Sequence, residues 1–190
     1  MSIRIYIDQG HNPRDYNTGA EGNGFYEQDI TYEVGVRLNA LLESNSAFTP
    51  RLSRPRADTV LGTSNSTSLR VRVLSANAWP ADLFLSIHAN ASVNPSVSGS
   101  ECLTYGPSST VANGVSARIL DEMATITGLE NRGIFYRPGL YVLRRTTMPA
   151  LIVEMGFISN ERDALLMAYS PGLFATSIYR GLLSYYGVSG

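Results

Sequence analysis

The sequence alternates between short apolar runs of strand character and longer segments with helical periodicity. Residues 2–8 carry isoleucine at every second position, as one face of a strand requires, whereas Phe25–Glu43 repeats its apolar residues at helical spacing. Further strands are predicted at 50–54, 82–88, 100–105, 141–143 and 150–153, and further helices around 69–79, over 109–127, from Asn160 and from Pro171. Strands that alternate with helices form a mostly parallel sheet covered on both faces. The pattern therefore predicts a three-layer α/β sandwich.

Length and composition place limits on what this fold does. With 190 residues, 44% of them hydrophobic and 16% charged, the chain has the composition of a globular protein, and we expect one domain spanning residues 1–190. A net charge of −1 gives no reason to expect a nucleic-acid partner. All 15 basic residues are arginines, so lysine-based chemistry is excluded. We also expect a monomer with neither a secretory signal nor a membrane-inserted segment.

The single cysteine is predicted to be a spectator. One thiol excludes both an internal disulfide and a zinc site built from several thiolates. Cys102 lies inside the strand-like stretch 100–105, where a buried and inert side chain is expected.

The only two histidines stand at matching places in the pattern. His11 closes the first apolar run, His88 closes Leu83–Ile87, and Glu154 follows a third run, Ala150–Val153. If these strands are parallel, their carboxyl ends meet at one edge of the sheet, and two imidazoles and a carboxylate converge there. This favours a metal site over the alternatives, a locally bonded turn histidine at 11 and a core histidine at 88.

Two glutamates are candidates for the remaining roles. A catalytic zinc ion takes three protein ligands and keeps a position for water. Glu27 opens the helix that follows the loop after His11, so it returns to the same strand end; alternatively, it only complements the helix dipole. Glu154 follows an apolar strand, where an unpaired carboxylate is unfavourable. It is therefore either a general base or the ion-pair partner of an arginine, for which the candidates are Arg72, Arg132, Arg144 and Arg145.

With these residues in view, the chain resembles the zinc-dependent N-acetylmuramoyl-L-alanine amidases of autolysins, sporulation hydrolases and phage endolysins. The resemblance spans nearly the whole sequence and rests on the segments Ile7–His11, Glu27, Arg72 with Asn77, Asp82–Asn90, Leu140–Leu143 and Met148–Asn160. The segment Asn12-Pro13-Arg14 departs from the glycines usual in the family, and the loop Thr59–Ser68 is longer than typical.

The resemblance implies a mixed sheet of six strands, with His11, Glu27 and His88 as ligands of one zinc ion and Glu154 as the catalytic glutamate. It also implies hydrolysis of the amide between N-acetylmuramic acid and L-alanine, with peptidoglycan of the bacterial cell wall as the substrate. Asp8 is placed to support the ligands and Asn90 to contact substrate. The alternatives are another zinc peptidase, such as a carboxypeptidase, and an inactive relative that binds peptidoglycan without cleaving it.

Overall fold

One mixed sheet of six strands organises the computed structural model, which describes residues 2–190. Its strands, in spatial order, are β4 (Phe48–Leu52), β1 (Ile3–Gln9), β5 (Leu83–Asn90), β8 (Ala150–Phe157), β6 (Ser100–Thr104) and β7 (Asn131–Tyr136). The first four are parallel, β6 runs antiparallel to β8, and β7 runs parallel to β6. The predicted mixed, mostly parallel sheet is confirmed.

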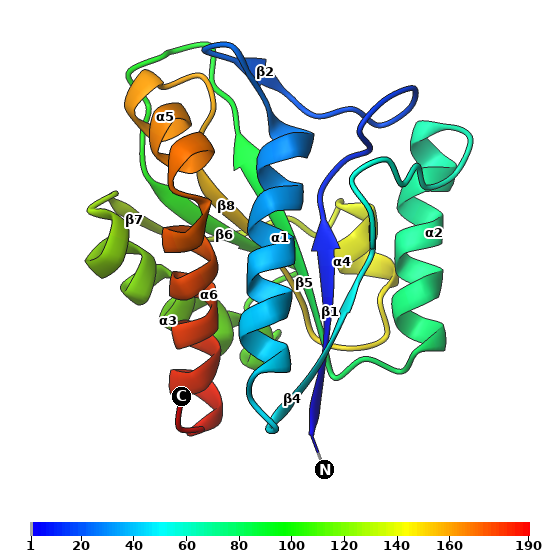
Figure 1. Cartoon of the computed structure of the whole chain (residues 1–190). Helices are drawn as coiled ribbons and strands as arrows, with labels where there is room; N and C mark the ends of the chain where they lie inside the picture. Colours follow the sequence, from blue (N-terminus) through cyan, green and yellow to red (C-terminus); the bar gives the residue numbers. More distant parts are fainter. Residues whose placement is uncertain (1) are drawn as a thin grey trace.

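Helices cover both faces of this sheet, as predicted for a three-layer fold. They are α1 (Glu27–Glu43), α2 (Asn65–Ala78), α3 (Thr110–Thr127), α4 (Tyr141–Arg145), α5 (Glu161–Tyr169) and α6 (Pro171–Tyr186). In Figure 1, α1 and α6 lie in front of the sheet and α4 lies behind it, with α2 beside β1. A two-stranded hairpin of β2 (Glu21–Gly22) and β3 (Phe25–Tyr26) precedes α1.

The strands divide their side chains between two hydrophobic cores because successive residues point to opposite faces. Ile5 and Ile7 of β1 belong to the larger core, with α1, α3, α5 and α6, whereas Tyr6 belongs to the smaller core, under α2 and α4. The same alternation separates Leu85 from Phe84 in β5. Each central strand therefore has a buried residue at nearly every position, as expected for a parallel sheet.

Local sequence signals account for several of the helix boundaries. Ser64 and Asn160 accept hydrogen bonds from backbone amides in the first turns of α2 and α5, and Pro171 stands at the start of α6. Gly128 ends α3 in the left-handed conformation, with φ of 70°, which glycine adopts without steric cost.

Three predictions about the elements were wrong. The segment 141–143, predicted as a strand, is the start of α4, because its two adjacent buried residues, Val142 and Leu143, fit one turn of helix against the smaller core. Strand β7 and the β2–β3 hairpin were not predicted. The helix predicted from Phe25 begins at Glu27, and α2 takes the last residues of the predicted loop 59–68, burying Ser68.

Two strands extend further than their apolar runs. β5 continues past His88 to Asn90, and β8 continues past Glu154 to Phe157. His88 and Glu154 therefore project from within paired strands, near the carboxyl ends of the parallel strands. Backbone pairing between β5 and β8 fixes their positions. None of the helices described over residues 2–190 combines the length and apolar character needed to cross a bilayer.

Candidate metal and catalytic site

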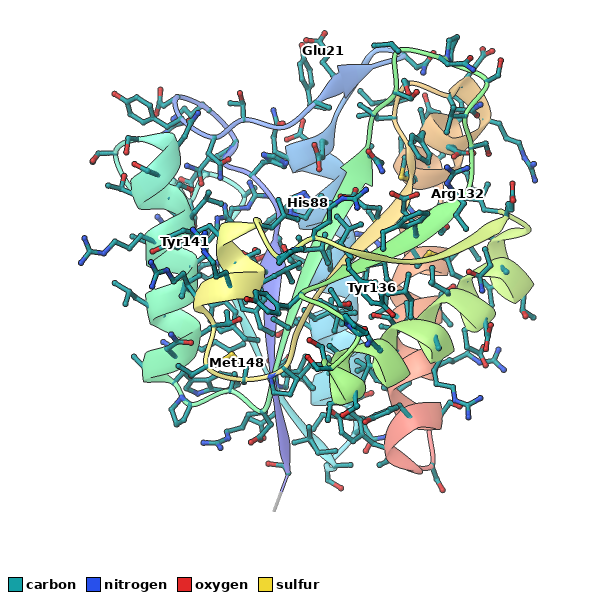
Figure 2. All side chains as sticks on the ribbon, turned by 180° about the vertical axis from the view of Figure 1, so that it is seen from behind. Glu21, His88, Arg132, Tyr136, Tyr141 and Met148 are labelled. Carbon is teal, nitrogen blue, oxygen red and sulfur yellow. The ribbon has the colours of Figure 1, made fainter. Side chains whose placement is uncertain are left out.

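The polar residues of the site continue the sheet face that carries the smaller core. Alternation along β1 puts Asp8 on the same face as Tyr6, and alternation along β5 puts Ser86 and His88 on the face of Phe84. The two strands are paired in register, with Asp8 opposite Ser86. Figure 2 shows His88 near the upper end of the strands, above α4 with its Tyr141. The apolar face thus becomes a polar one within two residues.

His11, Glu27 and His88 come together as predicted. Their potential ligand atoms all lie within 4.8 Å of one another. Oε1 of Glu27 lies 3.1 Å from Nε2 of His11 and 2.9 Å from Nδ1 of His88, and the ring centroids of the two histidines are 4.9 Å apart. One carboxylate oxygen is therefore shared by two imidazoles, one from the loop that follows β1 and the other from β5.

The backbone fixes the carboxylate of Glu27 in this position. Ala89 donates its amide hydrogen to Oε1 at 3.0 Å, and Ala20 donates to Oε2 at 2.9 Å. Burial alone would raise the pKa of Glu27, but the hydrogen bonds of His11 and His88 outweigh it and hold the pKa well below its usual range. Glu27 is therefore a buried carboxylate anion whose environment supplies the compensating charge.

The hydrogen-bond directions around His88 test whether the group suits a cation. Asp8 accepts a hydrogen bond from the Ser86 hydroxyl at 2.7 Å, and the same hydroxyl oxygen lies 3.1 Å from Nε2 of His88. Ser86 gives its only hydrogen to Asp8, so its oxygen accepts from Nε2–H. In the neutral ring, Nδ1 then carries a lone pair toward Glu27. Burial lowers the pKa of His88, but the hydrogen bond and charge of Glu27 raise it more, to about 9. Without a metal, the ring therefore also carries a hydrogen on Nδ1, which it donates to Glu27, and a bound cation would take the place of that hydrogen.

His11 faces Glu27 in the same way. Its Nδ1 lies 3.2 Å from the carbonyl oxygen of Asn17, which requires a hydrogen on Nδ1 and leaves the lone pair of the neutral ring on Nε2. Two imidazole lone pairs and a carboxylate oxygen therefore converge, and such a set of acceptors is satisfied by a metal cation. The donors, two nitrogens and one oxygen, are those of a catalytic zinc site with an open position.

Two glycines make the close approach possible. A Cβ atom on Gly10 would lie 2.6 Å from Cε1 of His88, and one on Gly19 would lie 2.7 Å from Cβ and 2.8 Å from Oε2 of Glu27. All three distances are shorter than the contacts that real Cβ atoms make. The backbone is also bent sharply at His11, whose φ of 67° lies in the left-handed region that side chains other than glycine rarely adopt.

A buried ion pair supports this bend. Arg72 donates to Asp8 at 2.6 Å and, through its other terminal nitrogen, to the carbonyl oxygen of His11 at 2.6 Å. The side chains of Arg72 and Asp8 are 1% and 2% exposed. Burial would raise the pKa of Asp8, but the charge of Arg72 and the Ser86 hydrogen bond hold it below its usual value. The predicted supporting position of Asp8 is thus explained by named contacts.

Glu154 lies beside the group formed by His11, Glu27 and His88 without belonging to it. It is paired in register with His88 of β5 on one side and with Glu101 of β6 on the other. Its Oε2 atom is buried and has no hydrogen-bond partner among residues 2–190. Burial raises its pKa to about 7, helped by the charges of Glu27 and Glu101 and opposed by that of His88.

The arginines proposed as partners of Glu154 are engaged elsewhere or are exposed. Arg72 pairs with Asp8, and Arg132 donates to Glu101 at 3.0 Å, while Arg144 and Arg145 are exposed on α4. The ion-pair alternative for Glu154 therefore has no support within the described residues.

Sequence reasoning missed Ser86 and Glu101. Both are polar residues within strands, on the sheet face that carries the candidate site, and this polarity was the signal available in the sequence. Asn90 donates to Glu101 at 3.0 Å, and its contact with a substrate stays a prediction. Cys102 is buried as predicted, and burial raises the pKa of its thiol to about 12.

A small cavity of about 120 Å³ opens beside the two histidines. Its lining includes His11, Ser86 and His88 as well as Leu140 and Tyr141 of the segment that begins α4. Its volume accommodates an ion and water molecules.

Comparison with known proteins identifies the family. The sequence profile of the N-acetylmuramoyl-L-alanine amidases (Amidase_3) matches residues 5–184. The chain is 37% identical over 188 residues to the N-acetylmuramoyl-L-alanine amidase LytC of Bacillus subtilis strain 168, covering 96% of this chain and 35% of LytC. It is 35% identical over 180 residues to the amidase CwlM of Bacillus licheniformis, covering 94% of this chain and 65% of CwlM.

The fold of a solved amidase structure also matches that of this chain. The catalytic domain of the amidase CwlV from Bacillus (Paenibacillus) polymyxa var. colistinus superimposes with a TM-score of 0.84 at 29% identity, covering 98% of this chain and 99% of that domain. The chain belongs to the N-acetylmuramoyl-L-alanine amidase family. It spans about a third of the length of LytC and somewhat under two thirds of that of CwlM.

Proposed function

We propose that the chain hydrolyses the amide bond between N-acetylmuramic acid and L-alanine in peptidoglycan, using one zinc ion. The observation that carries this proposal is the convergence of two imidazole lone pairs and a carboxylate oxygen beside a second, unpaired carboxylate. Family membership supplies the substrate class.

His11, Glu27 and His88 would hold the ion, leaving a position open for water or substrate. When bound, zinc supplies a Lewis acid that polarises the scissile carbonyl and acidifies water. The carboxylate of Glu27 would balance part of the ion's charge, and the backbone amides of Ala20 and Ala89 hold that carboxylate in place.

Glu154 is proposed as the general base and general acid. Amide hydrolysis breaks the bond between the lactyl carbonyl carbon and the nitrogen of L-alanine, and that nitrogen must gain a proton as the attacking water loses one. Glu154 takes the proton from the water and delivers it to the departing nitrogen. Its unpaired Oε2 atom can accept a proton, and a pKa raised to about 7 suits a group that both accepts and donates near neutral pH.

The bacterial cell wall is the proposed place of action, since peptidoglycan is located there. Digestion of purified peptidoglycan with zinc-loaded protein, followed by mass spectrometry of the fragments, tests the proposal. We expect new amino termini on L-alanine and free lactyl carboxyl groups. Cleavage between residues of the stem peptide would instead identify a carboxypeptidase or another peptidase, and binding without cleavage would identify an inactive relative.

A further inference from the structure

A continuous chain of hydrogen bonds runs from a buried arginine to one of the two histidines. Arg72 donates to Oδ1 of Asp8 at 2.6 Å, Ser86 donates to Oδ2 of Asp8 at 2.7 Å, and Nε2 of His88 lies 3.1 Å from the Ser86 oxygen. The directions of the bonds at Asp8 are fixed, because Arg72 can only donate and the Asp8 carboxylate can only accept.

The direction of each bond follows from these ends. Asp8 accepts from both neighbours, so the Ser86 hydroxyl points at Asp8 and its oxygen is free to accept from His88. A hydroxyl has one hydrogen, and Ser86 cannot donate in both directions. His88 must therefore carry its hydrogen on Nε2, and its Nδ1 atom is the one that lies 2.9 Å from Glu27.

We propose that Ser86 and Asp8 are positioning residues that hold His88 in the Nε2–H tautomer, so that Nδ1 is the nitrogen available to the metal. The inference deepens the proposed function, because the tautomer matters only if His88 is a ligand. A ligating histidine is commonly oriented by a partner of its other ring nitrogen. Here that partner is the hydroxyl of Ser86, and its direction is set by the ion pair of Asp8 with Arg72.

The Asp8→Asn substitution gives the sharpest test. It reverses the direction of the hydrogen bonds from residue 8 through Ser86 to His88, and it leaves the shape of the side chain almost unchanged. Arg72 can donate only to the oxygen of the new side-chain amide, so the amide nitrogen faces Ser86 and donates to it. The Ser86 hydroxyl then donates to His88, which stabilises the wrong tautomer, with a hydrogen on Nδ1 in the direction of Glu27. The Ser86→Ala substitution only removes the constraint, so its effect is smaller.

The chain is suited to a direct readout, because its only two histidines are both in this site. Selective ¹⁵N-histidine labelling of the zinc-loaded protein gives four ring-nitrogen signals, from which the ligating and protonated nitrogens are assigned. Zinc affinity is measured separately by competition with a chromophoric chelator. Ser177→Ala is the matched control, because Ser177 is buried in α6 and donates only to a backbone carbonyl of its own helix.

We expect His88 in the wild type to be protonated on Nε2 and ligating through Nδ1. Zinc affinity is expected to fall about 10–100-fold in Ser86→Ala, at least as much in Asp8→Asn, and not in Ser177→Ala. Ligation through Nε2 in the wild type overturns the proposal. So does an Asp8→Asn protein that remains folded with unchanged zinc affinity, or one whose thermal stability falls while affinity and ring signals stay those of the wild type. These measurements use no peptidoglycan, so a failure of the proposed hydrolysis is distinguished from a failure of this inference.

Discussion

Glu27 and Glu154 are two carboxylates on neighbouring parts of one site, and their surroundings treat them in opposite ways. Glu27 receives two backbone amides and faces two imidazoles, and its pKa is lowered. Glu154 has a buried oxygen with no hydrogen-bond partner among the described residues, and its pKa is raised to about 7. A carboxylate that is fully satisfied suits a permanent ligand, and one that is unsatisfied suits a group that exchanges protons. Environment, and not residue type, separates the two roles.

Removing the metal should produce the largest effect on activity. The ion would be held by Glu27 with the two histidines, and it would supply the Lewis acid on which the proposed cleavage depends. Treatment with a chelator is expected to abolish peptidoglycan cleavage while leaving the secondary structure intact, since the two hydrophobic cores do not include the site. Circular dichroism and turnover measured on the same sample check this. A global loss of helical signal would instead identify the metal as a structural element.

Exchanging each carboxylate for its amide should separate the two roles. Glu154→Gln is expected to keep its zinc and lose about 10²–10⁴-fold in turnover, the usual contribution of a general acid–base group. Glu27→Gln is expected to lose zinc as well as activity. Metal analysis beside turnover measurements provides the test, with His88→Ala as a reference for zinc loss. A Glu154→Gln protein that loses zinc would make Glu154 a ligand.

The metal-free protein should show opposite pH effects for the two substitutions. The folded-state pKa of Glu154, about 7, lies above its unfolded value of about 4.3, so its favourable contribution is complete below about pH 4.3 and is lost as the pH rises through 7. Glu154→Gln is therefore expected to gain stability over the wild type as the pH rises through that interval, by up to about 4 kcal/mol.

The contribution of Glu27 to stability depends on pH in the opposite direction. Because its folded-state pKa is lowered, its contribution is present above its unfolded pKa and is lost as the pH falls through the folded-state value. Glu27→Gln should therefore be destabilised at neutral pH, by a margin that shrinks in acid. Urea unfolding of both variants from about pH 8 down to about pH 3, below the unfolded pKa of glutamate, measures the differences. Parallel curves for the two variants would contradict the opposite signs of the two carboxylates.

The close packing around Glu27 should be sensitive to a single methyl group. A Cβ atom on Gly19 meets Glu27 at 2.7 Å, so Gly19→Ala is expected to cost about 1–3 kcal/mol of stability and to weaken zinc binding. Gly106→Ala is the control, because a Cβ atom there has no neighbour within 4 Å. Thermal unfolding and zinc titration compare the pair, and equal behaviour of the two variants would show that Glu27 moves aside freely.

The sequence predicted the layers and the proximity of His11, Glu27 and His88 because both depend on patterns of short range. Alternation within β1 and the apolar run of β5 located these strands, and the position of His11 and His88 after their apolar runs located the place where they meet. Segment 141–143 was misassigned because three consecutive residues are too few for either periodicity to be visible. Strand β7 escaped notice because it is an edge strand with only partly buried side chains and a glycine, Gly133, at φ of 90°.

The supporting network lay beyond sequence reasoning for a different reason. The contacts of Ser86 and Arg72 with Asp8 join residues 78 and 64 positions apart. Their existence depends on the registers of β1 and β5 and on where α2 crosses them. A polar residue in an apolar strand signals that a partner exists, but only the three-dimensional arrangement identifies it.

The pairing of β1 with β5 also sets the order of events during folding. His11 follows β1 by two residues and His88 lies in β5, and the chain between these two proposed ligands includes α1, β4 and α2. The ligand group is complete only after this long-range parallel pair has formed, which is a slow kind of contact to establish. Zinc should therefore bind a sheet that already exists, leaving the rate of refolding unchanged and slowing the rate of unfolding.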